Sequence, residues 1–400
     1  MARILMIAYT QYVHDGRVKR HAQALAERGD HIDVICLDNP QTGAQNGVNV
    51  IAVPMPQYRG GKSVSYLGSY LRFFAAAFAI AVKRSRQQPY DLAIVCTMPD
   101  AAVFCALPLR VFGTKILLDI HDTMPELYRE KFPGRRGAIG ERCLRVTERI
   151  STWCADRVLA VHEPHRRRLE LAGVNPDKIF VVLNTPDQRL FGSIRNAASM
   201  HKQTDEFTII CHGTIARRLS LDVAFEALRL LKARLPQVKL LVLGAGDYLS
   251  ECRALASRLN LEETVQFRPP VALEQLPEVL RQASVGLVPN RANSVTDLML
   301  PVKLLEYAAV GLPVIAARLK TIEHYFDDSA IRFFRPGDAA DLAAAIEDLY
   351  SSPERRLALA RNARRVIDRL SWQTQRETYY SAIDSILGHP HGGNLDRVAM

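Results

Sequence analysis

Short apolar runs rich in β-branched residues alternate with amphipathic helical segments along this chain, and this alternation constrains the fold more than any other feature. The first helical segment, RVKRHAQALAERG, places Val18, Ala22 and Leu25 on one face before Gly29 ends it. Further helices are predicted over residues 101–113 and 139–155. The apolar runs between helices are ARILMIAYT, HIDVICL, DLAIVC, TKILLDIHD and RVLAVH. Strands that alternate with helices predict a parallel sheet covered on both faces.

A second series of the same kind follows a polar segment, residues 187–206, that lacks periodicity. It begins with EFTIICHG and continues to the helix DAADLAAAIEDLY. We therefore predict an α/β protein of two doubly wound, Rossmann-like domains that face each other across a cleft, because such pairs bind ligands where the carboxyl ends of both sheets meet. The predicted parts are an N-terminal domain (1–187), a linker (188–206), a C-terminal domain (207–371), a terminal helix returning to the N-terminal domain (372–388) and a disordered tail (389–400).

The net charge of +10 is concentrated in the first half of the chain, where residues 1–187 contain 25 Lys and Arg against 18 Asp and Glu. A basic half suits nucleic acid, anionic lipid or a phosphorylated ligand. No helix-turn-helix, RNP-like or zinc-finger pattern accompanies the charge, so no nucleic-acid partner is expected.

The cysteines and apolar runs indicate the compartment. The seven cysteines are scattered, odd in number and without a C-x-x-C pair, which is typical of reduced packing residues in a cytoplasmic protein. The apolar stretch at residues 4–8 is too short for a signal peptide. The longest uncharged apolar run, residues 73–82, has half of the roughly 20 residues that a membrane span needs. We expect no spanning segment.

Two nucleotide-binding classes are excluded by their fingerprints. The GAG at residues 244–246 follows a strand, but Leu249 stands where a dinucleotide fingerprint requires its third glycine. A tight turn is therefore the preferred interpretation, and a dehydrogenase is not supported. No G-x-x-x-x-G-K-[ST] occurs, which excludes P-loop NTPases.

The most informative segment is DLMLPVKLLEYAAVGLPVIAA, residues 297–317. Pro301 suits the first turn of a helix, and Gly311 suits its C-terminal cap. The unpaired N–H groups of the first turn form an anion site, to which Lys303 adds a positive charge. Glu306 follows one turn later and can accept hydrogen bonds from ribose hydroxyls. The alternative is that Lys303 and Glu306 form an ordinary i,i+3 surface pair.

The pattern P-x-K-x-x-E-Y-x-A-x-G-x-P-V-I closely resembles the nucleotide-binding segment of glycosyltransferase family 4, a group of retaining enzymes with the GT-B fold. Other segments are similar to that family's motifs. They are DGRVKRHAQALAERGDHIDVI with Gly16, LLDIHDTMPE with His121, LNTPD with Asn184 and Asp187, and HGTIARRLSLDVAFEAL with Gly213 and Arg218. The resemblance implies donor-binding residues Gly16, Gly213, Arg218, Lys303, Leu304, Leu305 and Glu306, and catalytic residues His121, Arg218 and Lys303.

Two departures from the family pattern leave assignments open. The family's E-x7-E motif requires an acid eight residues before Glu306, and that position is Leu298, with Asp297 beside it. Ser220 stands where the family usually has glycine after the basic pair, which leaves Arg217 and Arg218 as alternative phosphate ligands.

The resemblance implies a metal-independent enzyme without a cofactor that moves a hexose-type sugar, with retention, from a nucleoside-diphosphate sugar to a glycan or polyprenyl-linked acceptor in bacterial cell-surface polysaccharide synthesis. No D-x-D follows a predicted strand, in keeping with metal independence. Two alternatives stay open: a GT-B epimerase or phosphorylase-like enzyme, and a non-catalytic nucleotide-sugar-binding module. The presence of Arg218 and Lys303 argues for chemistry.

A membrane-facing role is the last expectation. The segment SYLRFFAAAFAIAVKRSRQQ joins large apolar residues to the basic cluster Lys83, Arg84 and Arg86. It is either a buried core helix with a solvated basic end or a surface that rests on an anionic leaflet, on the inner face of the plasma membrane.

Overall fold

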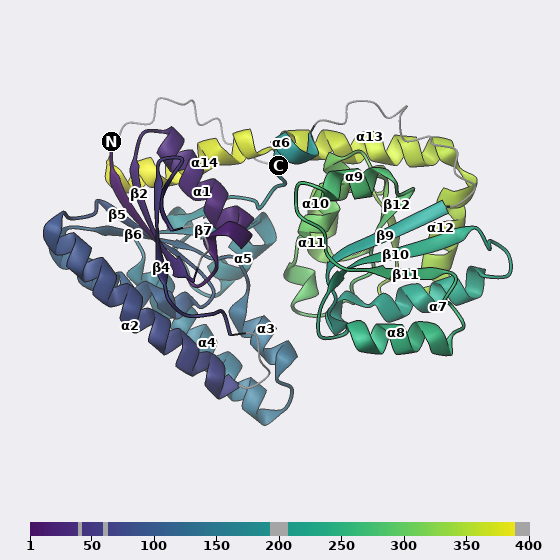
Figure 1. The fold of residues 1–400 in the computed structure, drawn as a ribbon, viewed down its shortest axis with the longest axis horizontal. Coiled ribbons are helices and arrows are strands. Elements are labelled where there is room, and N and C mark those ends of the chain that lie inside the picture. The colour runs from purple at the N-terminus through teal and green to yellow at the C-terminus, as the bar shows by residue number, and fades with distance from the viewer. Residues whose placement is uncertain (39–41, 59–62, 193–206, 389–400) are drawn as a thin grey trace. The chain divides into compact units, whose positions relative to one another are not determined.

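The first apolar run forms β1 (Arg3–Ala8) at the centre of an eight-stranded sheet in the computed structural model (Figure 1). The structure describes residues 1–38, 42–58, 63–192 and 207–388. They divide into unit 1, which comprises Met1–Asn184 and the segment from Gln375 onward, and unit 2, Thr185–Thr374.

The sheet of unit 1 has the strand order β3-β4-β2-β1-β5-β6-β7-β8. Its pairings are parallel except for the β3–β4 hairpin, whose strands the sequence patterns did not predict. The remaining strands are β2 (His31–Leu37), β3 (Gly43–Gln45), β4 (Val48–Val53), β5 (Leu92–Cys96), β6 (Lys115–Asp119), β7 (Arg157–Ala160) and β8 (Ile179–Val181). Open parallel sheets of this kind bind ligands at the carboxyl ends of their strands.

Helices cover both faces of this sheet. Leu5 and Ile7 of β1 pack in one hydrophobic cluster with Phe73 and Ala77 of α2. The helices of unit 1 are α1 (Gly16–Glu27), α2 (Ser63–Gln87), α3 (Met124–Lys131), α4 (Arg135–Cys154), α5 (Glu163–Leu171) and, at the end of the chain, α14 (Trp372–Leu387). The helix predicted over residues 101–113 is instead two 3-10 helices, η2 (Asp100–Cys105) and η3 (Leu107–Phe112), because Pro108 lacks the N–H group that a continuous helix needs there.

The helix α2 corrects the expectation that no segment is long enough to span a bilayer. That expectation counted the ten residues of the uncharged run alone, whereas residues Ser65–Gln87 of the helix are, by length and composition only, long and apolar enough to cross a membrane. A single helix of this kind is weak evidence for a span, because core helices of soluble proteins pass the same test.

Unit 2 has a six-stranded sheet, β11-β10-β9-β12-β13-β14, in which all pairings are parallel. Its strands are β9 (Phe207–Thr214), β10 (Val238–Ala245), β11 (Val265–Arg268), β12 (Val285–Val288), β13 (Val314–Ala317) and β14 (Arg332–Phe334). Its α-helices are α6 (Gln188–Phe191), α7 (Leu221–Leu231), α8 (Leu249–Arg258), α9 (Leu276–Arg281), α10 (Val302–Ala309), α11 (Lys320–Tyr325), α12 (Ala339–Ser351) and α13 (Pro353–Arg369). The chain is therefore α/β with two parallel-sheet, Rossmann-like domains.

The structural units differ slightly from the boundaries expected from the sequence. The chain leaves unit 1 after Asn184, three residues before the expected boundary, and returns to it at Gln375, within α14. Of the expected linker, residues 193–206 lie outside the described residues, as does the expected tail at 389–400.

The cysteine expectation holds for five of the seven residues. Cys36, Cys96, Cys105, Cys211 and Cys252 are buried free thiols, whereas Cys143 is exposed and Cys154 is half-buried. Both exceptions lie on α4, one face of which is turned to solvent.

Candidate active site

In unit 2, the structure places Lys303 beside the Gly213 turn at the end of β9. A Cβ atom added at Gly213 would lie 3.9 Å from Lys303 Nζ, and the φ angle of +103° at this residue is one that side chains disfavour. Lys303 Nζ also lies 3.9 Å from Cys211 Sγ. Gly213 thus leaves space beside the Lys303 ammonium, at the carboxyl end of the central strand of the sheet, where a doubly wound fold binds ligands.

The helix that carries Lys303 begins as the sequence predicts. Pro301 is the N-cap residue of α10, and Gly311, with φ +75°, follows the C-cap. The N–H of Leu304 already donates to Pro301 O at 3.0 Å, so the amides of residues 302 and 303 precede the first helical hydrogen bond. The side chains of Leu304 and Leu305 are buried in the core, and their predicted contact with a donor could only involve the backbone.

Glu306 is held by a histidine that sequence reasoning missed. His212 Nε2 lies 2.7 Å from Glu306 Oε2, and His212 Nδ1 lies 3.0 Å from the Tyr307 hydroxyl. Glu306 therefore contacts His212, and Lys303 contacts Cys211, the preceding residue of the same strand, β9. Among the described residues Lys303 and Glu306 form no ion pair, so the surface-pair alternative is wrong. The only sequence signal for His212 was its place next to Gly213.

Adjacent arginines differ in their surroundings, which bears on the open choice of phosphate ligand. Arg217 is exposed, forms an ion pair with Glu251 and lies over the ring of Tyr248. Arg218 is half-buried, forms no ion pair among the residues that the structure describes, and its Nε is buried without a partner. A guanidinium without a carboxylate partner is the one available to an anionic ligand.

Ser220 adopts the backbone conformation that explains the glycine usual in the family at this position. Its φ and ψ angles of 53° and 46° are left-handed, and it is the N-cap of α7. The Ser220 hydroxyl accepts a hydrogen bond from Arg291 Nε at 3.1 Å, and its buried side chain thus compensates part of the cost of this conformation. Ser220 thus adopts a left-handed conformation that glycine adopts more easily.

The position of the first glutamate in the family's E-x7-E motif is occupied by Leu298 in this protein. Leu298 ends the one-turn 3-10 helix Thr296–Leu298, and Asp297 forms an ion pair with Lys320 at 3.4 Å. The GAG turn fits the tight-turn interpretation, because a Cβ at Gly244 would lie 1.9 Å from Gly213 O. Gly244 lets β10 approach the turn that bears Gly213.

In unit 1, Gly16 opens α1 after β1. The Asp15 side chain caps this helix by accepting from Val18 N at 3.0 Å, and a Cβ at Gly16 would meet no atom within 4 Å. His121 follows β6, one strand beyond β5 in the sheet, and its side chain is 16% exposed. Both residues therefore follow the carboxyl end of a strand of one sheet.

Asp119 anchors the surroundings of His121. Arg17 donates to its two oxygens, from Nη2 at 2.7 Å and from Nε at 3.2 Å, and His121 Nε2 lies 3.1 Å from Oδ2. Burial alone would raise the pKa of the Asp119 carboxyl, but the charge of Arg17 and the contact with His121 outweigh burial and hold that pKa well below its usual range. Asp119 is therefore a carboxylate at neutral pH.

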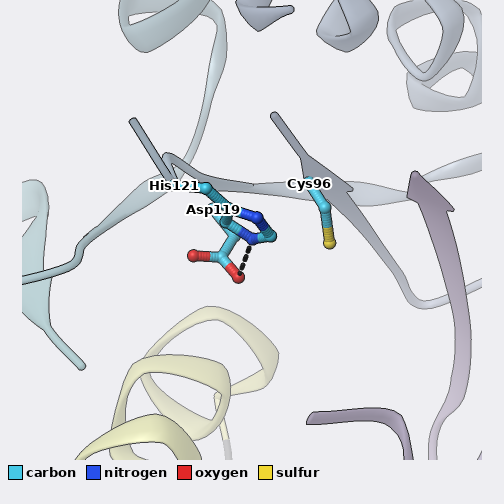
Figure 2. A group of neighbouring side chains, drawn as sticks. All are labelled: Cys96, Asp119 and His121. Carbon is cyan, nitrogen blue, oxygen red and sulfur yellow. Dashed lines mark hydrogen bonds and ion pairs between the residues drawn. The ribbon is translucent and has the colours of Figure 1, made fainter. Parts of the chain in front are cut away.

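Cys96, Asp119 and His121 form the one group among the described residues whose donor atoms lie close enough for a metal ion, all within 4.8 Å of one another (Figure 2). The donor set does not suit a cation. Both oxygens of Asp119 accept hydrogen bonds from the Arg17 guanidinium, whose charge opposes a metal ion at the same place. Burial also raises the pKa of the Cys96 thiol well above its usual value, so that it stays protonated. These side chains fit a hydrogen-bond network better than a metal site.

Comparisons with known proteins identify the family of the chain. Residues 16–185 match the family described as "Glycosyl transferase 4-like domain", and residues 194–366 match "Glycosyl transferases group 1". Two curated relatives are a D-inositol 3-phosphate glycosyltransferase of Thermomonospora curvata, 30% identical over 62% of this chain, and a GDP-mannose-dependent alpha-(1-6)-phosphatidylinositol monomannoside mannosyltransferase of Mycolicibacterium smegmatis, 29% identical over 43%. The matches span 63% and 46% of the length of these relatives.

Among solved structures, Anabaena HepE in complex with UDP-glucose is similar, with a TM-score of 0.72, 17% identity and coverage of 96% of this chain and 100% of that one. At this level of identity the likeness shows the fold alone. The two family matches cover adjoining parts of the chain, one on each side of the unit boundary. On these grounds the chain belongs to the GT-B glycosyltransferases of the family 4 type.

Proposed function

We propose that the protein transfers a hexose-type sugar, with retention of anomeric configuration, from a nucleoside-diphosphate sugar to a glycan or polyprenyl-linked acceptor, in bacterial cell-surface polysaccharide synthesis. The observation that carries the proposal is the cluster at the end of β9, where Lys303 lies beside Gly213 while His212 holds Glu306. One end of this cluster is cationic and the other is a carboxylate. This combination suits a diphosphate next to a ribose.

The proposed chemistry depends on stabilising the leaving group. As the bond between the anomeric carbon and the diphosphate oxygen breaks, negative charge grows on the β-phosphate. Arg218, Lys303 and the first amides of α10 would supply the positive charge and the N–H donors. The acceptor oxygen bonds to the anomeric carbon on the face that the diphosphate leaves, and the acceptor proton passes to the leaving phosphate. A dedicated base and a divalent ion are then unnecessary.

Names of the similar proteins support the two classes of substrate. HepE was solved with UDP-glucose, and the Mycolicibacterium relative is named for GDP-mannose and a phosphatidylinositol mannoside. Both names contain a nucleotide sugar, and the name of the Mycolicibacterium relative adds a glycolipid acceptor. A thermal-shift screen of UDP- and GDP-sugars would identify the nucleotide base and the sugar of the donor.

The deciding test is product analysis with a radiolabelled nucleotide sugar, with and without lipid extract. A transferase moves the label into a lipid or glycan fraction and releases the nucleoside diphosphate. An epimerase would instead leave the label on the nucleotide in a new sugar, and a binding module would leave the donor unchanged. Either of those two outcomes, with a donor that raises the melting temperature, would contradict the proposal.

We also propose that unit 1 contacts an anionic membrane peripherally, on the cytoplasmic side. The buried edge of α2 is narrow, formed by Phe73, Ala77, Ala81 and Ser85, while Leu67, Leu71 and Phe78 are exposed. One edge of this helix packs on the sheet and another presents apolar side chains to solvent, and the second edge supports the proposed contact. No acidic residue lies in α2, and four basic ones do.

The helix α4 has a second exposed apolar stripe, which the sequence analysis missed. Ile139, Val146, Ile150 and Trp153 recur at helical spacing and are 44–79% exposed. Arg142 and Arg149 lie one turn from these residues and are also exposed. Both α2 and α4 pack against η2, which contributes the exposed Phe104. An exposed face that is both apolar and basic suits an anionic bilayer, whereas a second copy of the same face would be repelled by its charge.

Liposome co-sedimentation tests this contact. Reversing Lys83 and Arg86 on α2 together with Arg142 and Arg149 on α4 to glutamate should abolish binding to phosphatidylglycerol vesicles, because each basic residue at such a surface contributes about 1 kcal/mol. Arg84 is left intact because it pairs with Asp33 at 3.3 Å. Reversal of the exposed Arg258 and Arg361 in unit 2 is the control. Binding that ignores lipid charge and the α2 and α4 reversals would contradict the contact.

A further inference from the structure

The contacts of the His121 side chain indicate which of its ring nitrogens donates a hydrogen bond and which accepts one. This inference rests on the proposed function and on the family resemblance, which implies that His121 is a residue of the active site. A neutral imidazole has one ring nitrogen that donates a hydrogen bond and one that accepts, and the partner of one nitrogen decides the role of the other. The role of one ring nitrogen of His121 therefore depends on which protein group contacts the other.

One ring nitrogen of His121 is accounted for by Asp119. Nε2 lies 3.1 Å from Asp119 Oδ2, and Figure 2 shows the imidazole edge turned toward this oxygen. No residue that the structure describes hydrogen-bonds to Nδ1. The main-chain N–H of His121 donates to Thr97 Oγ1 at 3.2 Å, which fixes the backbone from which the ring projects.

The partner of Nε2 can only accept. Asp119 is fully buried, and both of its oxygens accept hydrogen bonds from the Arg17 guanidinium, whose positive charge favours the ionised carboxylate. An ionised carboxylate has no proton to donate. Since the Asp119 oxygen accepts, the proton in this hydrogen bond belongs to His121 Nε2.

The other charged or titratable neighbours do not change this assignment. His21 Nδ1 lies 3.3 Å from the same oxygen of Asp119, but burial, and then the charge of Arg17, lowers the pKa of His21 to about 4. His21 is therefore neutral at pH 7 and leaves the negative charge of Asp119 in place. Arg17 also donates from Nη1 to Val182 O at 2.8 Å, so three hydrogen bonds fix the guanidinium that holds the carboxylate.

We propose that Asp119, held by Arg17, is the positioning residue of His121: it fixes the neutral imidazole as the Nε2–H tautomer and leaves Nδ1 as a hydrogen-bond acceptor for a substrate hydroxyl. The group recognised is thus a hydroxyl that donates, from the donor sugar or from the acceptor. A carbonyl or phosphate oxygen would find no proton at Nδ1 in this state. Asp119 acts through His121 and touches no substrate itself.

The tautomer of His121 can be measured directly in the active wild-type protein. ¹⁵N-histidine-labelled protein at pH 8 is examined by long-range ¹H–¹⁵N correlation NMR, and His121→Gln identifies the resonances of His121 among the eleven histidines. We expect a protonated Nε2 and an unprotonated Nδ1. A neutral ring protonated at Nδ1, or an imidazolium at this pH, would overturn the proposal.

Two substitutions distinguish a positioning role of Asp119 from a role in folding alone. Asp119→Asn should populate both tautomers and lower kcat at least tenfold. Asp156→Asn is the matched control, because Asp156 also pairs with an arginine, Arg110 at 2.9 Å, and accepts from Ile116 N at the opposite end of β6. It should leave the His121 spectrum unchanged. If Asp119→Asn does not fold, the wild-type tautomer still decides, and a wild-type tautomer that survives in folded Asp119→Asn refutes the role of Asp119.

Ligand additions identify the source of the hydroxyl. The nucleotide sugar with the largest thermal shift is added first, and lipid extract second. A shift of the Nδ1 resonance with the sugar nucleotide alone assigns the hydroxyl to the donor, and a shift only after the second addition assigns it to the acceptor. A bound donor and acceptor that leave Nδ1 unchanged would overturn the hydroxyl assignment. If no nucleotide sugar binds, the proposed function fails while the tautomer measurement stands.

Discussion

Arg217 and Arg218 offer a test of the donor site in which one residue controls for its neighbour. Both side chains carry the same charge and leave the same 3-10 helix, Arg217–Leu219. Arg217 is committed to Glu251, whereas Arg218 has no carboxylate partner among the described residues. We expect Arg218→Ala to lower turnover by two to four orders of magnitude and Arg217→Ala to change it less than threefold.

The magnitude follows from the charge that each substitution removes. A guanidinium about 4 Å from a phosphate, at an effective dielectric constant of about 20, contributes about 4 kcal/mol. If that interaction strengthens as the diphosphate leaves, its loss corresponds to a factor of about 10³ in rate. The exposed Arg217–Glu251 pair contributes at most about 1 kcal/mol to stability and nothing to the leaving group.

The assay compares kcat at saturating nucleotide sugar and the melting temperature of both variants. Arg217→Ala also serves as the control for altering the loop. Equal losses of kcat in the two variants would mean that the loop conformation, and not the charge of Arg218, matters. Turnover of Arg218→Ala within threefold of the wild type, at an unchanged melting temperature, would refute the assignment.

Three further predictions address other residues. Lys303→Ala should lower kcat by two to four orders of magnitude at an unchanged melting temperature, since its charge acts on the departing phosphate; steady-state kinetics check this. Glu306→Gln should raise the KM for the nucleotide sugar while kcat holds, because ribose contacts are equal in the ground and transition states, and an unchanged KM would remove Glu306 from the donor site. Burial, and then Glu148, raises the pKa of Asp100 to about 7, so the folded protein keeps a proton that the unfolded chain releases above about pH 4, and stability falls as pH rises toward 7. Asp100→Asn should therefore stabilise the protein more at pH 7.5 than at pH 4.5, by about 3 kcal/mol in unfolding free energy, whereas equal melting-temperature gains at both values would contradict this.

Local sequence predicts those parts of the donor site that depend on chain direction and backbone shape. The start of α10 at Pro301, the Gly213 turn and the alternation of strands and helices all follow from residues near in sequence. His212 could not be assigned to Glu306 in this way, because the two are 94 residues apart and meet only once β9 and α10 pack together.

The same limit applies to unit 1. Arg17 and Asp119 are 102 residues apart in the sequence, and neither motif indicates the other. The exposed stripe on α4 was missed for a different reason: a regular apolar spacing predicts a buried face, and only the packed structure shows which faces lack a covering element. Burial of Phe73 and exposure of Phe78 on one helix likewise depend on the neighbouring sheet.

Unit 1 consists of two separate stretches of the chain, and the second of them is synthesised after unit 2. Leu183 N donates to Gln375 Oε1 at 2.9 Å, and the Tyr380 hydroxyl donates to Ala24 O at 2.6 Å, contacts between residues 192 and 356 positions apart. Residues 185–374, which form unit 2, are therefore synthesised before the part of α14 that belongs to unit 1, from Gln375 onward. The strands of the second sheet, the last of which ends at Phe334, are thus synthesised while the first sheet still lacks the helix that contacts α1.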